Sequence, residues 1–171
     1  MLQSSTPSTS TIKVDNYTYI SEQIENRVVT TTGIFKLKQD MGFNQLRYYC
    51  HKKSVGRTFH IMTNRNYYGY KAVRYAIENP SPRAKACGSF TALPDDNSKI
   101  SQHCKKWGVD KSRGEVNMIG HSSYTGSQRL YHRFAFWKGY YYTGFQPNTY
   151  WCDDDSHAML SVGDVFEIYV R

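Results

Sequence analysis

The clearest pattern in the chain is an alternation of apolar and polar residues with the two-residue period of a half-buried β-strand. The segment from Asp164 to Val170 alternates in this way and predicts a C-terminal strand. Leu46 to His51 is short and rich in tyrosine, and Arg57 to Met62 is bounded by glycine and polar residues, so both also favour strands. Further strands are predicted at Lys13 to Ile20, from Ile34 to Leu37 around Phe35, at Val116 to Ile119, at Leu130 to Phe136 and at Lys138 to Phe145.

Helical patterns are confined to a few short segments. Ser21 to Arg27 predicts one short helix capped by its first residue. A second helix can be capped by Asp96 or Ser98 and ends at Gly108, whereas Tyr70 to Ile77 fits a strand and a helix equally well. Since the chain has no internal repeat and no βαβ alternation, the predicted fold is mainly β (α+β), with antiparallel sheets and one or two short helices, stapled by disulfides.

The length and composition indicate one domain preceded by a tail. A chain of 171 residues can build a core without relying on cross-links. Residues 1–11 are rich in Ser and Thr, which predicts a flexible N-terminal tail, and residues 12–171 then form a single extracellular recognition domain. The tail lacks the apolar core of a signal peptide, so a signal either has been removed or is not used. The apolar runs are too short to predict a membrane span.

The four cysteines are Cys50, Cys87, Cys104 and Cys152, and no two of them have the Cys-x-x-Cys spacing of a zinc or redox hairpin. Their gaps suit disulfides better, which places the protein outside the reducing cytosol and predicts a secreted, extracellular location. The alternative is four reduced thiols buried in a cytosolic domain. The four cysteines allow three disulfide pairings. The nested pairing is favoured, because the shorter loop closes easily; it joins Cys87 to Cys104 and Cys50 to Cys152.

The net charge of +8 favours acidic partners. The basic residues are dispersed, however, and form no run of five or six like charges, which is also typical of ordinary solvated surface. We expect a glycan or an acidic matrix polymer as the partner and regard nucleic acid as the less favoured one. The oligomeric state stays open, with a homo-oligomer among the alternatives.

Aromatic residues supply the candidate ligand contacts. Tyrosine has a flat apolar face and a polar tip, so it suits sugar surfaces as well as half-buried strands. The predicted binding residues are Tyr140, Tyr141, Tyr142 and Trp151, which would stack on sugar rings, and Arg129 and Arg133, which would hold sulfate or carboxylate groups. The alternatives are ordinary packing of these rings and stacking of nucleic-acid bases, since Arg and Lys also interleave with tyrosines between Tyr68 and Tyr75.

Three consecutive carboxylates, Asp153, Asp154 and Asp155, suggest calcium as the one candidate cofactor. Calcium takes six to eight oxygen ligands, and a loop would be needed to bring these side chains together, because successive residues of a strand point to opposite faces. The spacing of an EF-hand loop is absent. An acidic turn is therefore the competing interpretation.

Catalysis is not predicted, and no catalytic residue is assigned. The sequence lacks a Gly-x-Ser-x-Gly elbow, a P-loop, a Gly-x-Gly-x-x-Gly loop and a His-Glu-x-x-His motif. One alternative function is a structural or interaction protein of the matrix that binds no small ligand. The other is a basic secreted nuclease, which would need two imidazoles beside a phosphate, and the chain has six histidines. His121 and His132 are the best candidates for that pair, although the sequence cannot bring two histidines together.

The segment from Ser21 to Cys50 resembles the opening of fibrinogen-related domains. It carries Ser21 to Arg27, then Thr31 to Leu37 with the order Thr-Thr-Gly-Ile-Phe-Lys-Leu, then Leu46 to Cys50 with the order Leu-Arg-Tyr-Tyr-Cys. In that family a short helix precedes a Gly-x-Tyr-x-Ile strand and an aromatic-Tyr-Cys strand. The later segments Leu93 to Asp96, Trp151 to Asp154 and Phe166 to Val170 are similar to extracellular domains of marine invertebrates, including coral matrix proteins.

The resemblance implies a secreted recognition or matrix module, often lectin-like, and not an enzyme. The chain departs from the family in three respects. It has no cysteine before the first helix to pair with Cys50, and Gly56 to Ile61 replaces the family's Gly-Gly-Trp-Thr segment. The family's calcium loop has no counterpart here, so the aspartate site above is not part of the resemblance.

Overall fold

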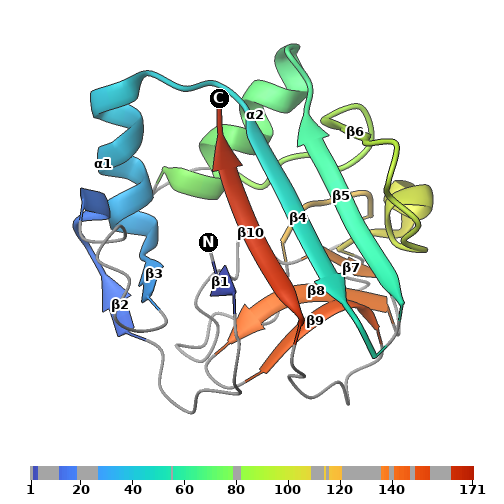
Figure 1. Cartoon of the computed structure of the whole chain (residues 1–171). Coiled ribbons are helices and arrows are strands. Elements are labelled where there is room, and N and C mark those ends of the chain that lie inside the picture. Colours follow the sequence, from blue (N-terminus) through green and yellow to red (C-terminus); the bar gives the residue numbers. More distant parts are fainter. Residues whose placement is uncertain are drawn as a thin grey trace.

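The structure, a computed structural model of the chain, describes residues 2–3, 12–18, 27–54, 56–78, 82–108, 114, 116–120, 136–138, 141–146, 149–154 and 163–171. Figure 1 shows the elements that these residues form. They are β1 (Leu2–Gln3), β2 (Ile12–Val14), β3 (Arg27–Val29), α1 (Thr31–Met41), β4 (Leu46–Lys52), β5 (Arg57–Thr63), α2 (Tyr67–Ile77), β6 (Phe90–Ala92), the 3₁₀ helix η2 (Ser101–Lys106), β7 (Phe136–Lys138), β8 (Tyr141–Gln146), β9 (Thr149–Asp154) and β10 (Val165–Val170).

The main sheet has five strands in the order β1-β10-β4-β5-β6, and all of its neighbours are antiparallel. The C-terminal strand β10 therefore lies beside the central strand β4, with Val170 opposite Leu46 and Val165 opposite His51. This arrangement confirms the predicted fold class of antiparallel sheets with short helices. It also confirms the predicted strands at β4, β5 and β10.

The two faces of the main sheet differ in burial. Residues of β4 alternate between buried and half-buried along the whole strand, so Leu46, Tyr48 and Cys50 enter the core while the residues between them do not. Phe59 and Ile61 of β5 continue the same buried face. The alternation follows from the two-residue period of a strand.

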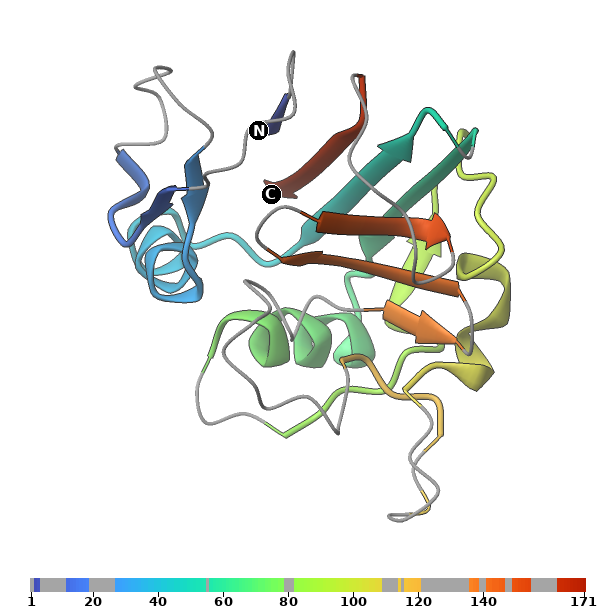
Figure 2. The same ribbon diagram turned by 90° about the horizontal axis from the view of Figure 1, so that it is seen from below.

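A second layer covers the buried face. It contains the sheet β7-β8-β9 and helix α2, which lie behind the main sheet in Figure 1 and below it in Figure 2. Strand β9 contacts both β4 and β5, and α2 contacts β5. Helix α2 contributes Val73, Tyr75 and Ile77 to the core, and Trp107, which is fully buried, stacks on Phe90 at a ring-centroid distance of 4.7 Å.

Both predicted disulfides are confirmed, with the nested pairing. Cys50 of β4 pairs with Cys152 of β9, with their Cα atoms 5.7 Å apart, and Cys87 pairs with Cys104 of η2, with a Cα separation of 5.2 Å. Across the described part of the chain, none of the helices combines the length and apolar character that crossing a lipid bilayer requires.

The predicted strand from Ile34 to Leu37 is wrong, because this segment lies inside helix α1. Thr30 is the N-cap and its side chain accepts a hydrogen bond from the Gly33 N–H. At the other end Gly42 has a left-handed backbone with φ of 68°, and its N–H donates to the Lys38 carbonyl. A capping hydroxyl and a C-terminal glycine thus outweigh the short alternation around Phe35.

The outcomes of the other local predictions differ. Tyr70 to Ile77 belongs to helix α2, and the helix predicted before Gly108 is only the 3₁₀ helix η2. Val116 to Ile119 is not a strand, since Met118 forms one isolated bridge with Lys85. Strands β6 and β9 were not expected. Of the helix predicted from Ser21 to Arg27, only Arg27 is described, and it begins strand β3. Of the predicted tail, Leu2 and Gln3 pair with β10.

Candidate functional site

The sequence-predicted binding residues fall mostly outside the described part of the chain. Arg129, Arg133 and Tyr140 lie outside it, as do the candidate nuclease residues His121 and His132. Tyr141 and Tyr142 begin strand β8. The described residues therefore do not test whether this set lies together, and these contacts stay predictions.

Trp151 of β9 lies in the interior, with only 8% of its surface exposed. It precedes Cys152, whose disulfide fixes β9 against β4. A ring with so little exposed surface presents no free face for stacking on a sugar. We therefore remove Trp151 from the set of surface contacts.

The calcium prediction gains no support from the described aspartates. Strand β9 runs through Asp153 to its end at Asp154, so the backbone here is extended and does not form the loop that calcium ligation would need. Asp155 lies outside the described residues. Within the part of the chain that the structure describes, no three His, Cys, Asp or Glu side chains gather closely enough to hold a metal ion.

Two surfaces of the described residues carry chemistry instead. The first is the tyrosine surface, which consists of Tyr67, Tyr68, Tyr70, Lys71 and Arg74 at the start of α2. Its three tyrosines are 63%, 49% and 43% exposed, and they make up half of the large apolar side chains that are exposed among the described residues. The Lys71 ammonium lies 4.4 Å from the Tyr67 ring centroid, a cation–π contact.

The tyrosine surface is held by its neighbours on both sides. Asn66 caps α2 by accepting a hydrogen bond from the Gly69 N–H at 2.9 Å. The side-chain amides of Asn64 and Asn66 both donate to the Gly88 carbonyl at 3.1 Å. Because Gly88 follows Cys87, the disulfide to η2 also restrains the loop against which the Tyr68 ring lies.

The second surface is the open face of the main sheet, which no described helix or strand covers (Figures 1 and 2). It is the opposite face to the core and carries the half-buried positions of three neighbouring strands. Its residues are Arg47, Tyr49 and His51 of β4, Thr58, His60 and Met62 of β5, and Glu167 and Tyr169 of β10. The strand register places Glu167, Tyr49 and His60 in one row across the sheet.

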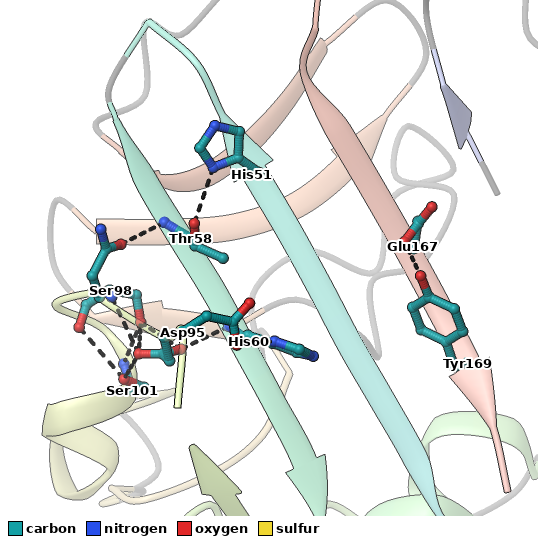
Figure 3. Close-up of polar contacts among 10 residues, drawn as sticks. His51, Thr58, His60, Asp95, Ser98, Ser101, Glu167 and Tyr169 are labelled. Atoms are coloured by element: carbon teal, nitrogen blue, oxygen red, sulfur yellow. Dashed lines mark hydrogen bonds and ion pairs between the residues drawn. The ribbon is translucent and has the colours of Figure 1, made fainter. Parts of the chain in front are cut away.

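His60 is the most tightly held side chain of the open face. Its Nδ1 lies 2.5 Å from Asp95 Oδ1. Figure 3 shows the two side chains beside each other. The Tyr49 ring meets the imidazole edge-on, with ring centroids 5.0 Å apart. The other ring nitrogen, Nε2, is buried and has no hydrogen-bond partner among the described residues. A buried polar atom without a partner is uncommon, so Nε2 is a candidate for chemistry or for ligand binding.

The loop that carries Asp95 is itself fixed to the sheet. Asp96 accepts a hydrogen bond from the His60 backbone N–H at 2.6 Å and also accepts from the hydroxyl groups of Ser98 and Ser101. Asn97 accepts from the Thr58 N–H at 2.6 Å. These contacts, drawn in Figure 3, position the Asp95 carboxylate beside the imidazole.

A charged group lies at the other end of the open face. The Arg47 guanidinium stands over the Tyr169 ring at 3.8 Å from its centroid, and the Tyr169 hydroxyl donates to Glu167. Burial and the hydrogen bond to Glu167 raise the pKa of Tyr169. Burial raises the pKa of Tyr49 as well, with smaller contributions from the negative charges of Asp95 and Glu167. Both phenols therefore stay protonated at neutral pH and can donate hydrogen bonds.

Sequence reasoning gave the tyrosines between Tyr68 and Tyr75 only as an alternative stacking surface, and it missed the open face. The pattern of Arg and Lys among tyrosines near Tyr70 was visible, but its exposure depends on which side of α2 enters the core. The open face depends on strand pairing, which joins residues far apart in the chain. Comparison of the chain with protein-family models, with curated proteins and with solved structures finds no match. The resemblance to fibrinogen-related domains stays a prediction, and its expected strand at Thr31 to Leu37 is helical.

Proposed function

We propose that the protein is a secreted, lectin-like binding module that recognises an acidic glycan polymer through the tyrosine surface. The observation that carries the proposal is the grouping of three exposed tyrosines with Lys71 and Arg74 on the first two turns of one helix. Exposed aromatic rings that lie together commonly mark binding sites.

The chemistry of these side chains suits an acidic sugar chain. Tyrosine rings stack on the apolar faces of sugar rings at a low cost in conformational entropy, because each has only two side-chain torsions. Lys71 and Arg74 can pair with sulfate or carboxylate groups, although Arg74 also contacts Glu78 at 2.8 Å. The net charge of +8 attracts a polyanion from a distance.

The support for extracellular action is the pair of disulfides, since such bonds persist in oxidising compartments. An extracellular matrix polymer would meet the protein there. The residues Tyr140 to Tyr142, Arg129 and Arg133 stay predicted contacts, and calcium stays a predicted cofactor. The binding assay can test the calcium prediction by adding a chelator. Variants of the predicted contact residues can be tested after the variants of the tyrosine surface.

The proposal can be tested on an array of sulfated, uronic-acid and neutral glycans. We expect the disulfide-bonded protein to bind acidic polymers, and we expect Tyr67→Ala and Tyr70→Ala each to weaken that binding about tenfold. Lys71→Glu should weaken glycan binding more at low salt than at high salt.

Helix α1 offers matched controls, because Phe35 is an exposed aromatic residue, 37% exposed, and Lys36 beside it is an exposed cation. Phe35→Ala and Lys36→Glu should leave binding unchanged. An array without hits, or equal binding by the Tyr67 and Phe35 variants, would exclude the tyrosine surface as a glycan site. Retention of RNA in place of glycans would assign the same surface to base stacking.

A further inference from the structure

Two of the six histidines, His51 and His60, lie on the open face of neighbouring strands. In the register of β4 and β5, His51 is opposite Thr58 and Tyr49 is opposite His60, so the two imidazoles are diagonal neighbours. Diagonal neighbours on one face of a sheet have Cα atoms about 7 to 8 Å apart. The register thus places both imidazoles on one face of the sheet, within reach of one substrate that lies along this face.

The two imidazoles are held in different ways. Asp95 fixes His60 through Nδ1 at 2.5 Å, which leaves the unpartnered Nε2 as the nitrogen that can accept a proton. His51 is held through Nδ1 by the Thr58 hydroxyl at 3.0 Å, so Nε2 is the nitrogen that it keeps for proton transfer. A carboxylate that orients an imidazole is the arrangement that general bases use.

Other groups of the open face suit an anionic substrate. Arg47 lies on the same strand and the same face as Tyr49 and His51, and its guanidinium can bind phosphate oxygens. The phenol of Tyr49, whose ring lies against the His60 imidazole, can donate a hydrogen bond. Glycoside cleavage, by comparison, relies on a pair of carboxylates and not on a pair of imidazoles. The residues of this face therefore favour a phosphodiester over a glycosidic bond.

We propose that His51 and His60 form an acid–base site that cleaves single-stranded RNA without a metal ion. His60 Nε2 takes the proton from a ribose 2′-hydroxyl while the 2′-oxygen forms a bond to phosphorus. The bond from phosphorus to the 5′-oxygen breaks, and that oxygen takes a proton from the protonated His51. The products are a 2′,3′-cyclic phosphate and a free 5′-hydroxyl, and proton exchange with water restores both imidazoles.

The structure also gives Tyr49 a part in this reaction. His60 is only 12% exposed and its Nε2 is shielded from solvent. The half-exposed Tyr49 ring lies directly across the strand pair and against the imidazole. Turning this ring outward opens Nε2 to the substrate. Tyr49 is thus a positioning residue that covers the base when the face is empty.

The experiment uses the full disulfide-bonded chain, a labelled single-stranded RNA and the DNA of the same sequence, all with a chelator present. We expect cleavage of the RNA alone, because DNA has no 2′-hydroxyl, and cyclic phosphate ends that mass spectrometry detects. His51→Gln and His60→Gln should each lower the rate at least 100-fold. His103→Gln is the matched control, since His103 is exposed on η2 and lies outside the open face, and it should cleave at the full rate.

Intact RNA after incubation with the folded wild-type protein would overturn the proposal. Equal cleavage by the His51→Gln and His103→Gln variants would overturn it too, because it would indicate a contaminating nuclease. If His60→Gln unfolds the protein, the cleavage rate of His51→Gln still tests the proposal. His51 lies on the surface of the sheet, so its replacement should leave the protein folded. The result is separate from glycan binding, because the two sites share no residue, and either can fail while the other holds.

Discussion

Cys50 of β4 and Cys152 of β9 form a disulfide across the core, and this bond joins the main sheet to the three-stranded sheet. Both residues are almost completely buried. The second disulfide, between Cys87 and Cys104, closes a much shorter loop at the edge of the molecule. The two bonds therefore constrain the unfolded chain to different extents.

Removal of the two disulfides should destabilise the protein unequally. The sequence separation is 102 residues for Cys50 and Cys152 and 17 residues for Cys87 and Cys104. By the chain-entropy model, loops of these sizes correspond to about 4.7 and about 3 kcal/mol of stability. The paired alanine variant of Cys50 and Cys152 should thus have the lower midpoint in urea unfolding. A lower midpoint for the variant of Cys87 and Cys104 would contradict this ranking.

Gly69→Ala should destabilise the protein although alanine favours helices. A Cβ atom at Gly69 would lie 1.9 Å from the Asn64 carbonyl oxygen, and a backbone atom in that position cannot simply rotate away. We expect a clash with a backbone atom to cost about 3 kcal/mol, which exceeds the gain of about 1 kcal/mol from helix propensity. Urea unfolding measures the change, and Lys71→Ala on the exposed side of the same helix serves as the control. A stabilised Gly69→Ala protein would show that the helix start shifts without strain.

The sequence predicts β4, β5 and β10 of the main sheet well, because β4 and β5 alternate between buried and half-buried residues and the sequence of β10 alternates apolar residues with Glu167 and Tyr169. It predicts α1 poorly. The short alternation around Phe35 competes with the spacing of Ile34 and Leu37, and only Thr30 and Gly42 as caps decide for the helix. Local patterns of four residues are too short to separate the two periods.

The candidate sites could not be predicted in the same way. His51 and His60 share a face only because β4 and β5 pair in one particular register, and a shift by one residue would move one imidazole into the core. Asp95 reaches His60 across 35 residues of sequence through the loop after β6. Such contacts come from non-local pairing, about which composition and spacing say nothing.

Stability should fall at alkaline pH because of Tyr48. Burial raises the pKa of its phenol far above the ordinary value of 10.0. Above pH 10 the unfolded chain therefore gives up this proton while the folded protein keeps it, and the free energy of unfolding decreases by up to about 1.4 kcal/mol per pH unit. Below pH 10 both states hold the proton and the effect is absent.

Tyr48→Phe removes this titration. Between pH 9 and pH 11 the free energy of unfolding of this variant should therefore fall less steeply than that of the wild-type protein, and the difference in slope should correspond to about one proton. Urea unfolding at several pH values measures the slope. Some slope remains, because the pKa values of Tyr49 and Tyr169 are raised as well. Tyr70→Phe, on an exposed residue, should keep the full slope. Equal slopes for the Tyr48 and Tyr70 variants would show that the buried phenol is not responsible.

The hydrogen bond between His60 and Asp95 predicts which imidazole nitrogen carries the proton in neutral His60. A carboxylate oxygen 2.5 Å from Nδ1 can only accept, so the proton should lie on Nδ1 and Nε2 should be unprotonated. Long-range proton–nitrogen NMR spectra at alkaline pH distinguish the two forms. In Asp95→Ala the acceptor is lost, and the Nε2-protonated form should appear. Glu78→Ala removes the same charge elsewhere and should leave the His60 signals unchanged. A wild-type His60 protonated on Nε2 would mean that Asp95 does not orient the ring, and it would leave His60 unable to act as the base of the open face.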